Sequence, residues 1–142
     1  MGDIDIDNLL KALSNENNET VLELDHKKVS KIKNDILQKL HLPKEKLKKF
    51  HKSLKFYRFV DELPELRYGS FIRWISLKNP EKIYLTNGGI VCEIKIGDDG
   101  IIIVCKNNRN RMFQLKMAEN LIFQKLTQQE QVLLSAMDYL NS

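Results

Sequence analysis

The 142-residue sequence lacks the segments that direct a chain into or through a membrane. No apolar run approaches the ~20 residues that a membrane-spanning helix needs. The N-terminus has Asp3, Asp5 and Asp7 where a signal peptide carries its positive charges. These absences predict an intracellular protein of the cytoplasm, the nucleus, or a viral factory or virion, with no membrane partner.

Cysteine is scarce, with only Cys92 and Cys105 present. Because no secretory signal is seen, two reduced and buried thiols are the favoured interpretation. The alternative is a cross-strand disulfide, since paired strands can bring two Cα atoms within bridging distance. His26, His41 and His51 lack the i, i+4 spacing of metal ligands and lie far from the cysteines in the sequence. Neither a metal nor a cofactor is predicted.

Catalytic motifs are also lacking. The sequence has no nucleophile elbow, and Asn87-Gly88-Gly89 is not followed by the Lys-Ser/Thr of a phosphate-binding loop. Asp98 and Asp99 are adjacent carboxylates, but a tight turn would leave them in water with no burial to tune them. No pocket with convergent polar groups is indicated, so the sequence predicts a protein that is not an enzyme.

Charge is distributed unevenly along the chain. Residues 1–25 hold seven acids and one lysine, whereas residues 26–58 hold twelve lysines or arginines and two acids, a net charge of +10. Residues 59–142 hold ten of each sign, and the whole chain has a net charge of +4. Localised charge governs the choice of partner more than the total does. The acidic segment either folds over the basic one as a mask or forms a disordered tail.

Two predicted turns organise the stretch from Lys82 to Lys106 into three short strands. The turns lie at Asn87-Gly88 and at Gly97-Asp98-Asp99-Gly100, where glycine reaches positive φ without strain. Both registers place the same apolar face inward, with Cys92 opposite Cys105. The residues predicted on that face are Ile90, Cys92, Ile94, Ile96, Ile101 and Ile103. The residues predicted on the other face include Val91, Ile102 and Val104.

Apolar periodicity predicts helices and further strands on either side of this stretch. Asp25 is a plausible N-cap, and Thr127 with Glu130 forms a capping box. The predicted helices cover residues 3–13, 26–41, 44–62 and about 128–140. The predicted strands cover residues 67–77, 112–117 and 121–126.

Together these elements predict an α+β fold with four parts. They are an acidic segment at 1–25, a basic helical hairpin at 26–63, a small antiparallel barrel at 64–126 and a C-terminal helix at 127–142. Short strands joined by tight turns are typical of SH3-like or OB-like barrels, which also remove exposed strand edges. The last helix would either plug one end of the barrel or dock on the helical hairpin.

Two groups of cations are candidates for binding nucleic acid, either DNA or RNA. The first lies on the second basic helix and comprises Lys48, Lys49, Lys52, Lys55 and Arg58. Lysines held by a helix can follow a phosphate backbone and release its counterions. The alternative is a solvated helix face whose aromatic residues belong to the core. The second group is Arg67, Arg73, Arg109 and Arg111, on the outer face and a loop of the predicted barrel. Arg73 beside Phe71 would stack on a base, or would simply pack its stem over apolar surface.

Three segments resemble uncharacterised small β-barrel proteins of large DNA viruses. They are residues 67–75 (RYGSFIRWI), 87–90 (NGGI) and 120–123 (NLIF). The resemblance covers residues 67–126, consists of glycines and strand residues, and implies a viral protein without assigned chemistry. It supplies no site residues.

Two functions follow from these patterns. The first is a non-enzymatic nucleic-acid-binding module whose basic helical hairpin contacts phosphates. The alternative is a structural or adaptor protein of a virion or larger complex, which binds another protein or a second copy of itself through the barrel. In that case the outward residues Val91, Ile102 and Val104 would form an exposed apolar patch.

Overall fold

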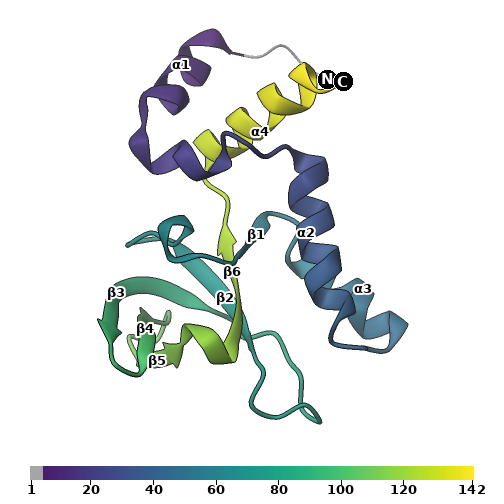
Figure 1. Cartoon of the computed structure of the whole chain (residues 1–142), viewed down its shortest axis with the longest axis vertical. Helices are drawn as coiled ribbons and strands as arrows, with labels where there is room; N and C mark the ends of the chain where they lie inside the picture. Colours follow the sequence, from purple (N-terminus) through teal and green to yellow (C-terminus); the bar gives the residue numbers. More distant parts are fainter. Residues whose placement is uncertain (1–4) are drawn as a thin grey trace. The chain divides into compact units, whose positions relative to one another are not determined.

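A computed structural model describes residues 5–142 and confirms the α+β class (Figure 1). The α-helices are α1 (Ile6–Ser14), α2 (His26–Gln38), α3 (Lys44–Ser53) and α4 (Gln128–Leu140). The strands are β1 (Tyr57–Val60), β2 (Phe71–Ser76), β3 (Gly89–Gly97), β4 (Gly100–Lys106), β5 (Met112–Lys116) and β6 (Asn120–Lys125). Three 3₁₀ helices are η1 (Glu16–Val21), η2 (Leu63–Glu65) and η3 (Met117–Glu119). Within residues 5–142, no helix combines the length and the apolar character that crossing a membrane requires.

The chain forms two compact units. Of the described residues, 5–58 and 126–142 make up the helical unit, and Phe59–Lys125 make up the sheet unit. The C-terminal helix therefore joins the N-terminal helices in one unit, which agrees with docking on the helical part rather than plugging a barrel. Residues 3 and 4 of the helix predicted at 3–13 lie outside the described residues.

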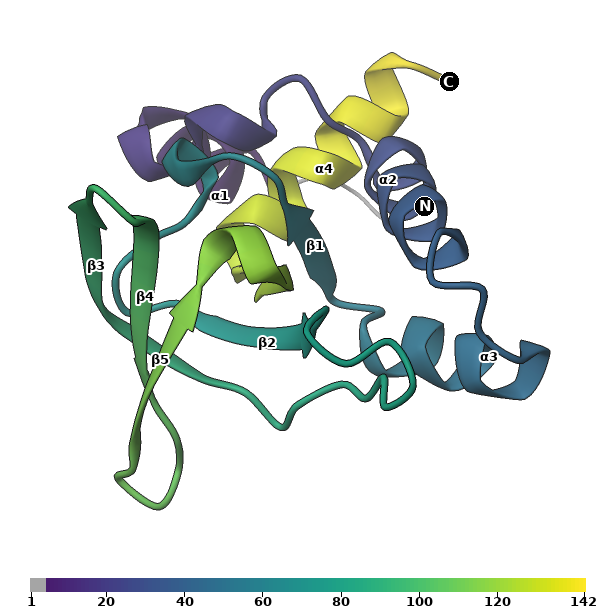
Figure 2. The same ribbon diagram turned by 60° about the horizontal axis from the view of Figure 1, so that its bottom comes forward.

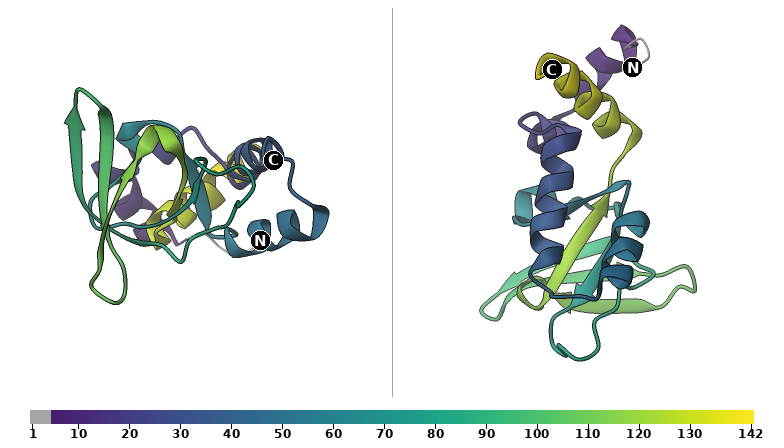
Figure 3. Two further views of the ribbon diagram at one scale, coloured as in Figure 1. Left: turned by 90° about the horizontal axis from the view of Figure 1, so that it is seen from below. Right: turned by 90° about the vertical axis from the view of Figure 1, so that its right-hand side faces the viewer.

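The helical unit is held together by two small apolar clusters. Ala12 and Val21 pack with Leu133, which ties α1 and η1 to α4. Val29 and Leu134 pack with Leu126 and so join α2 to α4. The side-by-side arrangement of α1 and α4 is visible in Figures 1 and 3. Of the acidic residues from position 5 to 25, Asp7, Glu16 and Glu19 lie in α1 and η1, and Asp5 and Asp25 cap α1 and α2, so they are part of the folded helical unit rather than of a disordered tail.

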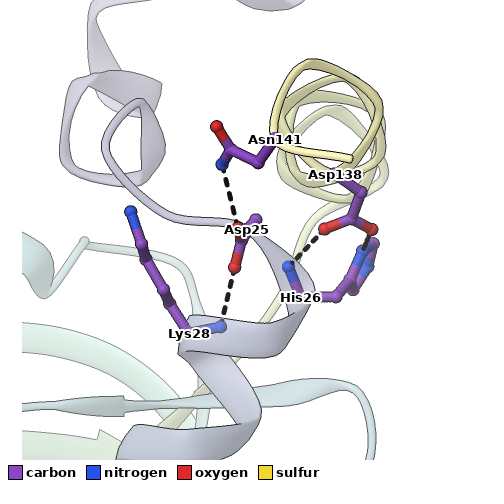
Figure 4. A network of polar contacts seen from close by, with 5 residues as sticks. All are labelled: Asp25, His26, Lys28, Asp138 and Asn141. Carbon is purple, nitrogen blue, oxygen red and sulfur yellow. Dashed lines mark hydrogen bonds and ion pairs between the residues drawn. The ribbon is translucent and has the colours of Figure 1, made fainter.

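A polar network joins the start of α2 to the end of α4 (Figure 4). Asp25 is the N-cap of α2, as predicted, and its carboxylate accepts hydrogen bonds from the Lys28 amide at 2.7 Å and the Asn141 side chain at 2.9 Å. These bonds favour the ionised carboxylate and lower the pKa of Asp25, with the Lys28 amide making the largest contribution. The His26 amide donates to Asp138 at 2.8 Å, and the imidazole pairs with the same carboxylate.

Helix α3 is shorter than the predicted helix at 44–62. It ends at Ser53, and the following residues form strand β1 at Tyr57–Val60. The apolar spacing from Phe50 to Tyr57 suited a helix, but the β-favouring sequence Phe-Tyr-Arg-Phe-Val pairs with β6 in the sheet instead. Tertiary pairing therefore overrides the local pattern at this point.

The six strands form one antiparallel sheet in the order β1-β6-β2-β3-β4-β5. Within the described chain, β1 and β5 are the two edges of the sheet and no ladder joins them, so the predicted closed barrel is wrong. The sheet does curl, because Trp74 on β2 and Phe113 on β5 lie with ring centres 6.4 Å apart although two strands separate β2 from β5 in the order. Its buried core includes Ile72, Ile103 and Ile122.

The β3–β4 hairpin confirms one predicted turn and corrects its register. Asp98 and Asp99 form the turn between the paired residues Gly97 and Gly100, and Ile94 pairs with Ile103 as predicted. A β-bulge between Val91 and Glu93 then shifts the pairing by one residue, so that Val91 rather than Cys92 lies opposite Cys105.

This shift exchanges the faces of the residues before the bulge. Val91 is buried, whereas Cys92 and Ile90 are exposed, so the predicted inward positions of Cys92 and Ile90 are wrong. Both cysteines are free thiols, and burial raises the pKa of the Cys105 thiol to about 12, helped by the neighbouring Cys92. Ile96, also predicted inward, is 72% exposed near the hairpin tip.

The second predicted turn, at Asn87-Gly88, is wrong. Instead of folding back on residues 82–86, strand β3 pairs directly with β2, with Gly89 opposite Ile72. A Cβ on Gly88 would lie 2.3 Å from the Ile72 carbonyl oxygen, and one on Gly89 would lie 2.8 Å from the Lys106 carbonyl oxygen. These two glycines allow close approach of neighbouring backbones rather than a two-residue hairpin.

Candidate nucleic-acid interface

The lysines predicted to bind phosphate lie exposed on and just after α3. Lys48, Lys49 and Lys52 belong to the helix, and Lys55 follows its C-cap. The spacing of Lys48 and Lys52 by four residues puts their side chains on one face of α3, about 6 Å apart along its axis. Lys49 lies beside Lys52 at a spacing of three. The helix therefore brings several ammonium groups into one small area.

These ammonium groups are not neutralised by the chain itself. Among residues 5–142, no carboxylate lies within ion-pair distance of Lys48, Lys49, Lys52 or Lys55. Helix α2 offers a contrast, because Lys31 pairs there with Asp35 at 2.7 Å. The Lys55 ammonium lies 5.4 Å from the ring centre of Phe56, an aromatic contact that leaves its positive charge in place.

Arg58, the fifth residue of this predicted group, is only 2% exposed. Its guanidinium donates to the Thr20 hydroxyl at 2.8 Å and to the Thr20 carbonyl at 3.5 Å. A buried guanidinium engaged with the protein's own backbone cannot reach a phosphate in solution. The expected phosphate contact of Arg58 is therefore contradicted by its burial, and its role is structural.

Lys33 has a similar structural role that the sequence did not reveal. It is 5% exposed, and its ammonium donates to the carbonyls of Leu54 at 2.8 Å and Lys55 at 3.4 Å, just beyond the end of α3. A cation at this position also opposes the negative end of the helix dipole. Burial lowers the pKa of Lys33 because the charged form is poorly solvated there.

His51 shares α3 with the exposed lysines. Burial, and then the charge of Lys33, lower the pKa of His51 below its usual value of 6.5. The imidazole is therefore neutral at pH 7. The positive charge of α3 at neutral pH comes from its lysines.

The acidic residues between positions 5 and 25 do not mask these lysines. Within the part of the chain that the structure describes, no ion pair joins a carboxylate of residues 5–25 to a lysine of α3. Helix α1 packs instead on α4 through Ala12 and Leu133. The basic surface of α3 is thus accessible from solution within the helical unit.

Arg73 is half-buried in the sheet unit and does not stand free beside Phe71. Its Nε donates to the Thr86 carbonyl at 2.7 Å, and its stem packs close to Gly88. Thr86 in turn accepts a hydrogen bond from the Trp74 amide through its hydroxyl, at 3.1 Å. Arg73 therefore fixes the segment after β2, which agrees with the alternative in which its stem covers neighbouring residues.

Arg109 and Arg111 are exposed on the loop between β4 and β5, which extends beyond both strands (Figure 2). The side-chain oxygen of Asn107 accepts hydrogen bonds from the amides of both arginines, each at 2.9 Å. The Asn107 amide donates to the Arg111 carbonyl at 3.0 Å, and Asn110 adopts a positive φ of 61°. The loop backbone is thus held in one shape while both guanidinium groups stay in solvent.

A pocket of about 640 Å³ opens beside this loop. Its walls come from β2, from the segment before β3, from the β4–β5 loop and from β5. Its lining includes four aromatic rings and both loop arginines, with no acid among the described residues that line it. The lining residues are Phe71, Trp74, Tyr84, Thr86, Asn87, Gly88, Asn107, Asn108, Arg109, Arg111 and Phe113.

The pocket was not anticipated from the sequence, which indicated no convergent polar groups. Phe71, Arg109 and Arg111 are among the residues that the sequence indicates for a site, whereas Trp74, Tyr84 and Phe113 are not. Phe113 falls within the strand predicted at 112–117, and Tyr84 falls within a predicted strand that does not form. A sequence signal for this pocket is the recurrence of aromatic and amide residues near the ends of separate strands. This pattern indicates a site only when the curl of the sheet, which brings β2 and β5 together, is known.

The apolar patch expected on the outer face of the sheet is not exposed. Val91 and Val104 are buried, and Ile102 is half-buried. This removes the surface on which the structural or adaptor alternative depended. Among the described residues, no group of three or more His, Cys, Asp or Glu side chains is arranged to hold a metal ion.

Comparison with known proteins gives no match. No protein-family model matches the chain, and neither a curated protein nor a solved structure shows significant similarity to it. The resemblance of residues 67–126 to small barrel proteins of large DNA viruses therefore stays a prediction.

Proposed function

We propose that this protein is a non-enzymatic nucleic-acid-binding module in which the exposed lysines of α3 contact the phosphate backbone. One observation carries the proposal. Lys48, Lys49 and Lys52 are exposed close together on α3, and Lys55 is exposed just after it, all without an internal carboxylate partner in the described chain and within a segment of net charge +10. Lysines in such a setting keep their affinity for an external polyanion.

The physical driving force would be the release of counterions. Each phosphate that a lysine neutralises frees a condensed cation, and log K falls with log salt by about 0.9 per contact on duplex DNA. Four contacts from the α3 lysines would therefore give a slope of roughly −3 to −4. Lysine contacts of this kind position the protein without reading sequence.

The composition of the pocket supports the non-enzymatic part of the proposal. Its lining includes no His, Cys, Asp, Glu, Lys or Ser side chain within the described residues, and Tyr84 and Thr86 are its only side chains of the types that commonly serve as general acid or nucleophile. The adaptor alternative is the weaker proposal, because Val91 and Val104 are buried and do not form a docking patch.

The experiment is charge reversal at the four lysines. The variant Lys48→Glu, Lys49→Glu, Lys52→Glu, Lys55→Glu is expected to lose measurable binding to labelled duplex DNA at low salt, with circular dichroism showing that it remains folded. A matched control changes the same amount of charge at exposed lysines of the sheet unit, namely Lys82, Lys95, Lys116 and Lys125. The control should retain most of the affinity. Equal losses in both variants would show that only the total charge matters, and unchanged binding in the first would refute the proposal.

A further inference from the structure

The pocket of the sheet unit is lined by aromatic rings and by two arginines. A ligand that suits both has a flat ring and a negative charge, and few kinds of ligand have both. Trp74 and Phe71 lie on its β2 side, and Phe113 on its β5 side. Tyr84 and Phe113 are 58% and 42% exposed, so both rings are accessible to a ligand that enters the pocket. At about 640 Å³ the pocket is within the size range of small-molecule sites and could enclose one nucleotide unit.

The rings are arranged to receive another flat ring. Trp74 and Phe113 meet edge to face, with centres 6.4 Å apart and planes at 61°, so their faces do not cover each other. A base that enters the pocket would stack on one exposed face, a contact that tolerates any of the bases. The backbone of Trp74 is held in place, since its amide donates to the Thr86 hydroxyl at 3.1 Å.

The two arginines would give the pocket its preference for a ligand that carries a negative charge. Arg109 and Arg111 line the same pocket, and no carboxylate among the described residues pairs with either guanidinium. Asn107 holds both backbone amides at 2.9 Å, so the loop needs little further ordering when a ligand binds. Guanidinium groups recognise phosphate oxygens through paired hydrogen bonds.

Two amide side chains could contact the edge of a base. Asn87 and Asn108 line the pocket, and neither side chain is engaged in a hydrogen bond within residues 5–142. An amide can both donate and accept, so it can pair with a base edge that is not already paired. The Watson–Crick edge of a base is available in a single strand but is already paired in a duplex.

From these observations we infer that the pocket binds one unpaired nucleobase together with its adjoining phosphate, so that the sheet unit recognises single-stranded nucleic acid. The base would stack on the aromatic walls, and the phosphate would pair with Arg109 and Arg111. This inference rests on the proposed nucleic-acid-binding function but concerns a site separate from the α3 lysines. A base inside a duplex is stacked and paired and would not enter such a pocket.

The chain contains its own reporter for this site, because Trp74 is its single tryptophan. Adenosine monophosphate, which has too few phosphates to depend on the α3 lysines, is expected to change the Trp74 emission saturably. A thymidylate single strand should do the same at lower concentration, while a duplex of equal length should leave the emission nearly unchanged. No change with either single-stranded probe would overturn the inference.

Variants locate the effect within the pocket. Tyr84→Ala removes an exposed ring and should weaken single-strand binding about tenfold or more, with Phe113→Ala as a second test of the opposite wall. The double variant Arg109→Gln, Arg111→Gln keeps the backbone amides that bond to Asn107 and should weaken binding to a similar extent. Its matched control, Lys95→Gln with Lys125→Gln, removes the same charge from exposed positions outside the pocket and should change little.

The outcomes separate this inference from the proposed function. Charge reversal on α3 should abolish duplex binding and leave the response of Trp74 to adenosine monophosphate intact. The pocket variants should show the opposite pattern. Loss of the Trp74 response in the lysine variant, or equal single-strand affinity in pocket and control variants, would contradict the pocket assignment. A chain that bound single strands but no duplex would refute the α3 proposal alone.

Discussion

The helical unit and the sheet unit hold their cationic side chains in different settings. In the helical unit the exposed lysines of α3 contrast with two buried cations, Lys33 and Arg58, that bond to the protein's own carbonyl and hydroxyl oxygens. In the sheet unit Arg109 and Arg111 are exposed on a loop whose backbone is fixed by Asn107. The flexible lysines suit a sequence-independent polyanion, whereas arginines beside aromatic rings suit a defined ligand.

The contrast between exposed and buried cations shows that the net charge of a segment does not identify which of its residues bind a ligand. Arg58 and Lys55 lie three positions apart in the same basic segment, yet one is buried and the other is in solvent. The partner of each cation decides its role. Substitutions of the buried cations should therefore lower the free energy of unfolding, whereas substitutions of the exposed cations should lower the affinity for nucleic acid.

The largest effect on stability is expected at Arg58. Replacement by Ala removes the hydrogen bonds to Thr20 and leaves a space in the buried region, which should lower the free energy of unfolding by about 2–4 kcal/mol. Urea denaturation would measure this change. Lys55→Ala is the matched control and should lie near the wild type. An Arg58→Ala variant with unchanged stability but lost DNA binding would contradict the structural role assigned to Arg58.

A smaller effect is expected at Lys33. Lys33→Ala removes the ammonium that donates to the carbonyls of Leu54 and Lys55, of which the Leu54 carbonyl keeps the Tyr57 amide as a donor, and should cost about 1–3 kcal/mol at pH 7. Helix α3 should fray at its C-terminal end as a result. Amide hydrogen exchange in α3 would report this fraying, which should be absent in a control such as Lys31→Ala on the exposed side of α2.

The lowered pKa of Lys33 adds a pH dependence with a defined sign. Between the folded-state pKa and 10.5, the unfolded chain binds more protons than the folded one at this group. The free energy of unfolding contributed by Lys33 should therefore rise as pH rises through that window. Lys33→Met removes the titrating group, and the difference between wild type and variant should show the rise. A difference that falls with pH would contradict the burial of the ammonium.

The smallest effect on stability is expected at the exposed lysines. Lys48→Ala, Lys49→Ala and Lys52→Ala should each change the free energy of unfolding by less than about 0.5 kcal/mol, because surface substitutions without internal partners rarely do more. A change much above this value in any of them would reveal an internal contact and would weaken the case for an external phosphate.

Local sequence patterns anticipated the elements with strong local signals. The Asp25 N-cap, the capping box at Thr127 and Glu130, and the turn at Asp98-Asp99 all depend on residues a few positions apart, and all are present. The exposure of Lys48, Lys49 and Lys52 also agrees with a simple helical face.

The predictions that were wrong concern features that depend on contacts between residues far apart in the sequence. The bulge beside Cys92 shifts a register that the turn at Asp98-Asp99 alone would continue, and Gly88 lies close to the Ile72 carbonyl rather than in a two-residue turn. The buried roles of Lys33 and Arg58 depend on carbonyls and hydroxyls far along the chain. The pocket requires β2 and β5 to approach through the curl of the sheet, which pairwise strand patterns do not encode.

The most direct test of the central claim is the salt dependence of duplex DNA binding by the unaltered chain and by the α3 charge-reversal variant. For the unaltered chain, log K should fall linearly with log salt with a slope of roughly −3 to −4, and the α3 variant should show almost no binding over the same range. A slope near zero for the unaltered chain, or equal slopes for both proteins, would contradict the assignment of phosphate binding to the lysines of α3.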